Sequence, residues 1–264
     1  MAEGPEGSVL LEARMAAAVT GQPQPGPRRR RRFFRVSVRG LLFLILLLGC
    51  AFGWIARVAR SGNVQRRAVA AIYQAGGWVV YDTEWDERQN ASAWKPRWPK
   101  ALVNQVGVDY FADVVFINLH DRGTDQVLMH VARLKNLKQL HRVGLAVTDA
   151  GLSHVGQLRN LQLLSLDDTQ VTDAGLAHLK GLTNLSGLFL RDTQVSDAGL
   201  VHVEGLTNRH ILSLARTQVS NIGLARLKGL TKLNELSLDG SQATDAGEPE
   251  LLRALPNLKV KVYP

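Results

Sequence analysis

Leucines recur at fixed intervals over the C-terminal half of the chain. The segment "LQLLSL" places Leu161, Leu164 and Leu166 at L-x-x-L-x-L spacing. The alternation of Leu164 and Leu166 is typical of a strand with one buried face. In "TDAGLAHLKGL", leucines recur every three residues from Leu176 to Leu182, which indicates a short helix. Each unit therefore predicts one strand followed by about two turns of helix.

Polar residues at both ends of the helical stretch support this interpretation. Thr172 or Asp173 can cap the free amides of the first helical turn. Gly181 can end the helix in a left-handed conformation.

The unit is repeated with a period of 24 residues. Four copies run from Thr148 to Ala243 without an insertion, and weaker copies begin at Thr124 and Thr244. A strand-like run, "VVFINL" at residues 114–119, precedes them. Repetition at this period is typical of a solenoid. Parallel strands pack about 4.8 Å apart and helices about 10 Å apart, so we expect a curved stack with the strands on its concave side.

The motif L-x-x-L-x-L-x-x-T-x-V-T-D-A-G-L-x-x-L resembles the leucine-rich repeat family in its T-D-A-G-L variant. The resemblance covers residues 124–264 and implies an α/β fold: a right-handed leucine-rich repeat solenoid, or horseshoe, with a parallel concave sheet and short convex helices. That family usually places Asn or Cys after the strand. Here hydroxyl side chains stand at that position, which predicts a hydroxyl ladder at Thr169, Thr193, Thr217 and Ser241.

Two arginines interrupt the leucine pattern. Arg142 stands where Leu166 stands in the next repeat, and Arg209 stands where Leu161 and Leu185 stand. We expect these repeats to be looser or locally shifted.

The net charge of +9 suggests an acidic partner until the charges are located. Residues 1–67 hold 12 Lys or Arg and 3 Asp or Glu, whereas residues 68–264 hold 20 of each. Seven arginines from Arg28 to Arg39 precede an uncharged, mostly apolar run at residues 40–56. Nucleic-acid-binding arms rarely adjoin such a run, so the pattern favours a signal for membrane topology and no nucleic-acid partner.

The apolar run predicts one transmembrane helix. Its 17 residues would extend about 25 Å as a helix. Seven arginines precede the run and four follow it closely, which favours a single-pass cell-membrane protein with a cytoplasmic N-terminus and extracytoplasmic repeats. One alternative is a lipoprotein anchored at Cys50, because "LLLGC" resembles a lipoprotein cleavage site. A buried helix is a second alternative.

Residues 66–85 read as an amphipathic helix, a break at Gly76 and Gly77, and a strand at residues 78–81 that could cover the apolar end of the first repeat. Trp85, Trp94 and Trp98 follow in a loop, where they either pack against this cap or form a binding patch. This layout resembles that of bacterial single-pass membrane-anchored leucine-rich repeat proteins.

The chain therefore divides into four predicted segments: a disordered basic tail at 1–35, a transmembrane helix at 36–58, a helix-strand cap with a Trp-rich loop at 59–99, and repeats with a C-terminal cap at 100–264.

Candidate chemistry is sparse. A column of histidines recurs every 24 residues, but no second column of ligands accompanies it, so we expect an exposed column and no metal site: His130, His154, His178 and His202. Four aspartates are interpreted as helix-capping residues: Asp149, Asp173, Asp197 and Asp245. No nucleophile elbow, phosphate-binding glycine loop or H-E-x-x-H motif occurs. We expect no catalytic residues, no cofactor and no enzymatic activity.

Binding of a partner by the protein surface is the class of function that remains. Concave positions vary between repeats, which favours a binding face, although drift on an unused surface gives the same variation. These positions are Phe116, Asn118, His120, Gln139, His141, Val143, Leu163, Ser165, Asp167, Gly187, Phe189, Arg191, Ile211, Ser213, Ala215, Glu235, Ser237 and Asp239. Exposed aromatic and arginine side chains concentrate binding energy. The candidate ligand-binding residues are His141, Asp167, Phe189, Arg191 and Asp239.

The sequence thus predicts a membrane-anchored, non-catalytic module that binds a protein or peptide. The alternative is a structural or envelope-organising protein that self-associates. An enzyme of unrecognised type is a third, weaker possibility.

Overall fold

The computed structural model describes residues 38–82, 85–86, 91–92, 103, 105–110, 112–244 and 246–261. The chain forms two compact units, residues 1–51 and residues 52–264, and each is considered by itself. The predicted tail at 1–35, Trp94 and Trp98 lie outside the described residues.

Short strands alternate with short helices through most of the larger unit. The described strands are β1 (Trp78–Tyr81), β2 (Trp85–Asp86), β3 (Ala91–Ser92), β4 (Val114–Asn118), β5 (Gln139–His141), β6 (Leu163–Ser165), β7 (Gly187–Phe189), β8 (Ile211–Ser213), β9 (Glu235–Ser237) and β10 (Lys259–Lys261). The described α-helices are α2 (Val38–Gln74), α4 (Asp125–Val131), α5 (Asp149–Val155), α6 (Asp173–Leu176), α7 (Asn221–Leu224) and α8 (Glu248–Ala254). Single turns of 3₁₀ helix are η1 (Val108–Tyr110), η2 (Ala177–Gly181), η3 (Gly199–His202) and η4 (Ala225–Gly229).

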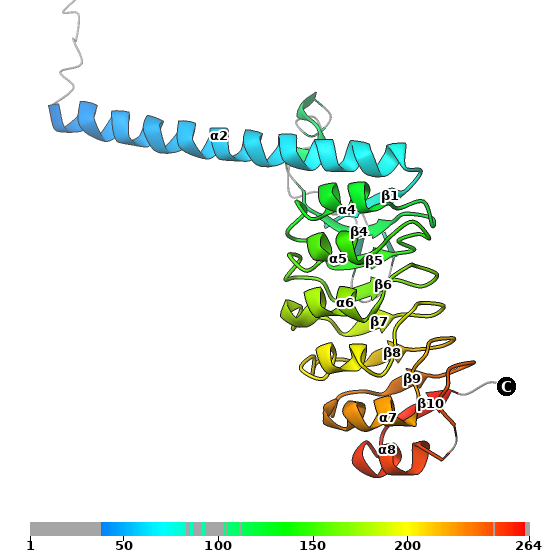
Figure 1. The fold of residues 1–264 in the computed structure, drawn as a ribbon. Helices are drawn as coiled ribbons and strands as arrows, with labels where there is room; N and C mark the ends of the chain where they lie inside the picture. Colours follow the sequence, from blue (N-terminus) through cyan, green and yellow to red (C-terminus); the bar gives the residue numbers. More distant parts are fainter. Residues whose placement is uncertain are drawn as a thin grey trace, which may run out of the picture. The chain divides into compact units, whose positions relative to one another are not determined.

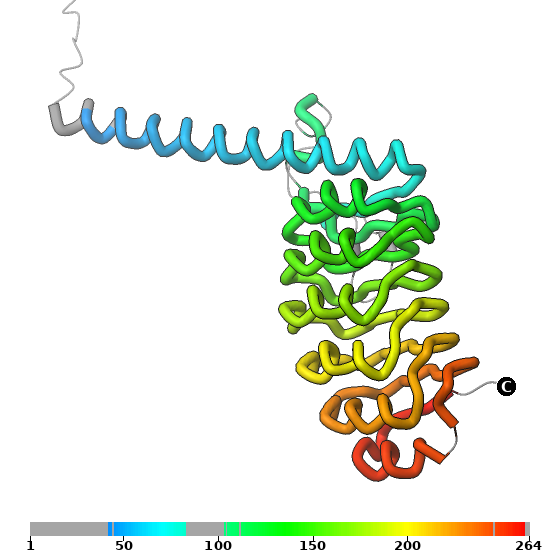
Figure 2. The backbone as a smooth tube through the Cα atoms, in the orientation of Figure 1, coloured from blue at the N-terminus to red at the C-terminus, as the bar shows by residue number. Residues whose placement is uncertain are grey.

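Eight of these strands build one sheet in the order β1-β4-β5-β6-β7-β8-β9-β10, and β2 and β3 form a separate two-stranded sheet. Strands β4 to β10 pair in parallel, and β1 adds to the first edge in antiparallel orientation. The helices of successive repeats lie along one side of this sheet (Figure 1). The backbone makes one turn per repeat, and neighbouring turns lie side by side (Figure 2).

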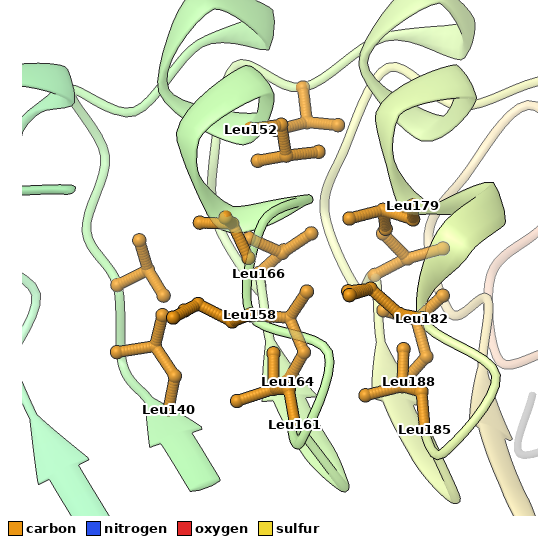
Figure 3. Packing of buried hydrophobic residues seen from close by; sticks show 14 of the residues in the cluster. Leu140, Leu152, Leu158, Leu161, Leu164, Leu166, Leu179, Leu182, Leu185 and Leu188 are labelled. Carbon is orange, nitrogen blue, oxygen red and sulfur yellow. The ribbon is translucent and has the colours of Figure 1, made fainter. Parts of the chain in front are cut away.

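Leucine columns form the core between sheet and helices (Figure 3). Leu164, Leu188 and Leu212 pair in register at the centre of consecutive strands and are fully buried. Burying one such side chain contributes about 1.5–3 kcal/mol. Because each repeat copies the same leucine positions, the core is continuous from one repeat to the next.

The T-D-x-G segment links each repeat to the next. Thr172 occupies the N-cap of α6, and its hydroxyl accepts a bond from the amide of Ala174. The Asp149 carboxylate of the preceding repeat accepts bonds from the Thr172 amide at 2.8 Å and from the Thr172 hydroxyl at 2.6 Å. The same two hydrogen bonds join three further pairs of neighbouring repeats. The bonded residues are Asp125 with Thr148, Asp173 with Ser196, and Asp197 with Ser220.

These aspartates therefore do not cap their own helices as the sequence suggested. The preceding hydroxyl residue supplies the cap in α5 and α6, as Ser220 does before Asn221 in α7, and the aspartate carboxylates act between repeats. Asp245 lies outside the described residues. The glycine of the T-D-x-G segment makes room for this carboxylate, because a Cβ atom on Gly175 would collide with Asp149. Only glycine leaves room for the cross-repeat bond.

The hydroxyl residues after the strands act within their own repeats. The Thr169, Thr193 and Thr217 hydroxyls donate to the carbonyls of Leu166, Leu190 and Leu214 at 2.6–2.7 Å. They satisfy buried carbonyls locally and do not form a ladder between repeats.

An amide ladder stands before the strands instead. Asn160, Asn184 and Asn208 each donate to a backbone carbonyl of the preceding repeat at 2.9–3.0 Å. These cross-repeat bonds supply the amide ladder that we did not expect from the sequence.

Gly181 also differs from expectation. It ends the 3₁₀ turn η2 and is not among the glycines with positive φ. The Arg159 guanidinium lies close to Gly181 and donates to its carbonyl at 2.9 Å.

The first repeat is covered by α2 and β1. Ala68, Val69 and Ile72 on the last turns of α2 are buried in the same cluster as the repeat leucines. The helix ends before Gly76, which has φ +83°, and the chain then enters β1. Because residues 57–74 contain no proline, the helix runs on from the apolar segment without a break.

One helical stretch in the described part of the chain, Ile45–Gln74, is long and apolar enough to cross a membrane. Many apolar side chains in its first half are exposed in the chain itself, including Leu46, Phe52 and Trp54. Cys50 is exposed on the same helix.

Candidate binding face

The strand register defines an open sheet face, which is the face of the sheet opposite the leucine core. Residues on either side of each central core residue point toward it. Paired residues form two rows across this face. The first row holds Phe116, Gln139, Leu163, Gly187, Ile211, Glu235 and Lys259, and the second holds Trp78, Asn118, His141, Ser165, Phe189, Ser213, Ser237 and Lys261.

An aromatic stack occupies the N-terminal end of the open sheet face. The Trp78 and Phe116 ring centroids are 4.9 Å apart, and those of Phe116 and His141 are 4.8 Å apart. The planes of neighbouring rings differ by only 29° and 24°. These stacked rings come from β1, β4 and β5, and Trp78 remains 38% exposed. Three strands therefore present one nearly continuous aromatic surface.

His141 is held at the end of this stack. Its Nε2 lies 3.2 Å from the Gln139 side-chain oxygen. Burial lowers the pKa of His141, because a charged imidazole loses hydration there. Burial therefore favours the uncharged form of the imidazole in the stack.

Asp167 and Arg191 meet near the middle of the face. The Arg191 amide donates to Asp167 Oδ1 at 2.9 Å, and the Ser165 hydroxyl donates to Oδ2 at 3.2 Å. Burial raises the pKa of the Asp167 carboxyl, and the hydrogen bond that it accepts from the Arg191 backbone amide opposes this rise. The Arg191 guanidinium turns instead to Asp192, at 3.1 Å. Asp167 is thus already engaged within the protein, whereas half of the Arg191 side chain is exposed.

The remaining two predicted residues lie apart from these groups. Phe189 is half-buried on β7, and its ring lies close to the position that a Cβ atom on Gly187 would occupy. Asp239 follows β9, and its Oδ2 lies 3.4 Å from the Ser237 hydroxyl. The structure therefore brings together Asp167 and Arg191, places His141 in the aromatic stack, and leaves Asp239 two repeats beyond Arg191.

Several positions assigned to this face are buried. Val143 is 0% exposed and belongs to the leucine core, so its assignment to the surface was wrong. Ser165, Gly187 and Ala215 are also buried. The usable surface is therefore narrower than the sequence suggested.

Sequence reasoning missed Trp78. It assigned the residue to the cap strand, although an aromatic residue at alternating spacing in an edge strand shares a face with the next strand. That periodicity was the available signal.

The histidine column is not uniformly exposed. His178 is exposed, but His130, His154 and His202 are half-buried. Among the described residues, no group of three His, Cys, Asp or Glu side chains is placed to hold a metal ion.

The repeats define the class of this chain: a leucine-rich-repeat-like α/β fold with a parallel sheet. No protein-family profile and no curated protein matches the sequence. Among solved structures, an internalin (inlF) of Listeria monocytogenes is 27% identical with a TM-score of 0.44, over 50% of this chain and 36% of the internalin. The chain thus spans about a third of that protein.

Two further structures are similar in part. Internalin C2 (inlC2) of Listeria monocytogenes is 21% identical over 74% of this chain and 92% of its own, with a TM-score of 0.42. The leucine-rich repeat ectodomain of the receptor kinase GASSHO1/SCHENGEN3 of Arabidopsis thaliana is 16% identical over 50% of this chain and 16% of its own, with a TM-score of 0.37. The assignment of the class rests on the repeats seen in this chain.

Proposed function

We propose that this chain is a membrane-anchored leucine-rich repeat module that binds a protein or peptide without catalysis. The supporting observation is the aromatic stack of Trp78, Phe116 and His141 on the open sheet face. Exposed aromatic surfaces supply large contact area with little loss of side-chain entropy, so they concentrate binding energy. The repeats form a right-handed, curved solenoid, and the open sheet face is its concave side.

The apolar part of α2 is the anchor in this proposal. Its exposed leucine and phenylalanine side chains suit a hydrocarbon environment. Seven arginines from Arg28 to Arg39 and four between residues 57 and 67 favour a cytoplasmic N-terminus and extracytoplasmic repeats. External protease should then remove the repeats from intact cells and leave a tag at residue 1 protected. Protected repeats would contradict this orientation.

The anchor also has a lipoprotein alternative. Replacing Cys50 with Ser should leave the chain in the membrane fraction if α2 spans the bilayer. Release of the Cys50→Ser variant into the soluble fraction would instead establish a lipid anchor at this residue.

A photo-crosslinking amino acid tests the binding face in the full chain. Placed at residue 78, it should capture a discrete heterologous protein, and the same group at residue 178 on the helix side should not. Capture of only a second copy of the chain would support the alternative, a self-associating structural protein.

Substitution then measures the contribution of the stack. Trp78→Ala should weaken binding of the captured partner by about 30-fold, which corresponds to a loss of about 2 kcal/mol. The double variant Phe189→Ala, Arg191→Ala is the matched comparison, because these two residues lie in the middle of the open sheet face. Loss of binding only in the second variant would move the site there.

A further inference from the structure

A basic cleft opens between α2 and the first repeat, on the part of α2 that belongs to the larger unit. Its volume is about 350 Å³, within the range of small-ligand sites. Arg57 and Arg60 line it from α2, and Arg133 and Lys135 line it from the segment after α4. Asp113 is the only acidic residue among the described residues of its wall.

The cationic groups of this cleft are available to a ligand. No described residue forms an ion pair or hydrogen bond with the side chains of Arg57, Arg60 or Arg133. Among the described residues, the Lys135 ammonium group donates only to the Gln157 side-chain oxygen, at 3.3 Å. The Asp113 carboxylate is already occupied, because its Oδ2 accepts a bond from the Asn136 amide at 2.8 Å. Four positive charges therefore face one engaged negative charge.

The wall formed by α2 is held firmly in place. The side-chain amide of Gln65 donates to the Ala112 backbone carbonyl at 2.6 Å. Tyr110 packs directly on Gly62, and its hydroxyl donates to Asn63 Oδ1 at 3.0 Å. The arginines thus project from a fixed helix, which lowers the entropy lost when an anion binds between them.

The cleft also lies at a defined position along the chain. Arg57 directly follows the apolar run at residues 40–56 on the same continuous helix. The helix rises about 1.5 Å per residue, so Arg57 and Arg60 lie within about 6 Å of the end of that run. If the run fills the hydrocarbon core, these residues reach the depth of the lipid phosphates.

We infer that this cleft binds the phosphate of an anionic phospholipid headgroup. The inference rests on the proposed membrane anchoring by α2. Guanidinium groups bind phosphate oxygens through paired, charge-assisted hydrogen bonds, and Lys135 adds a point charge. A phospholipid held in this way would tie the first repeat to the bilayer surface.

The test uses the full chain in phosphatidylcholine nanodiscs, with and without 30 mol% phosphatidylglycerol. Hydrogen exchange is followed at residues 57–65 and 133–136. The cleft variant carries Arg57→Gln, Arg60→Gln and Arg133→Gln. A charge-matched control carries Lys180→Gln, Arg253→Gln and Lys259→Gln on exposed sites away from the cleft. Inorganic phosphate added to the phosphatidylcholine discs tests a soluble anion as the source.

Phosphatidylglycerol should protect both segments in the wild type and in the control. In the cleft variant, the protection gained at 30 mol% phosphatidylglycerol should be at least about 10-fold smaller, because each surface cation contributes about 1 kcal/mol near an anionic bilayer. Equal protection in the two variants, or no protection in the wild type, would overturn the inference. Equal protection by millimolar inorganic phosphate would overturn the lipid source.

Failure of the anchor gives a different result. A chain that does not enter phosphatidylcholine nanodiscs would contradict the proposed anchoring before any headgroup is tested. A chain that enters them but shows no effect of phosphatidylglycerol would contradict only the headgroup site.

Discussion

Two arginines stand at leucine positions, and the chain accommodates them in opposite ways. At Arg142 the backbone adopts φ +49° and the side chain is 62% exposed, 3.8 Å from the Asp121 carboxylate. Val143 then enters the core in its place and is fully buried. The local shift predicted for this repeat is present.

At Arg209 the register does not shift. Strand β8 pairs normally with both neighbours, and Arg209 is 0% exposed. None of its three guanidinium nitrogens has a hydrogen-bond partner among the described residues. Burial lowers the pKa of Arg209 to about 9, because the charged form loses its hydration.

The position of each arginine in the repeat explains the difference. Arg142 precedes a turn, where one residue with positive φ can rotate the chain and bring the next side chain inward. Arg209 lies between Leu206 and Leu212, which are both buried. The next amide, that of His210, is tied to the Ser186 carbonyl at 2.7 Å. A slip here would therefore remove leucines from the core, so the arginine stays inside.

The largest expected effect is a gain in stability from Arg209→Leu. This lowering of the Arg209 pKa to about 9 corresponds to roughly 5 kcal/mol. Leucine restores the repeat pattern without a buried charge, so we expect the free energy of unfolding to rise by about 3–5 kcal/mol. Urea unfolding of the full chain in detergent measures this change.

Arg142→Leu is the matched control for that substitution. It removes the same charge from an exposed site, and we expect a change within about 0.5 kcal/mol. Similar gains in both variants would mean that loss of net charge, and not the buried environment of Arg209, determines stability.

A smaller effect tests the shift at Arg142. Val143→Ala should lower the free energy of unfolding by about 1–3 kcal/mol, because it leaves a cavity in the core. Arg142→Ala should change it by about 0.5 kcal/mol or less. The same unfolding measurement compares them, and the opposite order would contradict the shifted register.

The smallest expected effect is a dependence of the free energy of unfolding on pH that arises from Arg209. Its folded-state pKa lies below the unfolded value, so the unfolded chain binds more protons above about pH 9 and stability rises with pH there. The advantage of Arg209→Leu over the wild type is complete below about pH 9 and should shrink by roughly 1 kcal/mol between pH 9 and pH 10.

This comparison is measured as the difference between the two proteins at each pH, so other titrating groups cancel. An advantage that stays constant through this range would show that the buried guanidinium remains charged.

Local periodicity was enough to predict much of the fold. The 24-residue period, the strand at 114–119, the cap strand at 78–81 and the buried leucines could be read from the sequence. Each depends on residues close together in the chain, where spacing determines which side chains share a face. The helix cap at Thr172 follows from the same local rules.

The candidate site was less accessible to such reasoning. The aromatic stack joins residues 78, 116 and 141, and the basic cleft joins residues 57 and 60 to residues 133 and 135. Spacing along the chain could indicate that Trp78 shares a face with the next strand, but it could not show these approaches, because they depend on how β1 and α2 cover the first repeat.

Sequence alone thus determined the repeated strand and helix, since a leucine at the right interval is buried whichever repeat carries it. Only the tertiary structure decided that Asp149 bonds to Thr172 of the following repeat and that Gly175 leaves room for this bond. It also decided that Val143 replaces Arg142 in the core while Arg209 stays buried. The physical reason is that contacts between repeats determine the space and the hydrogen-bond partners available to each side chain.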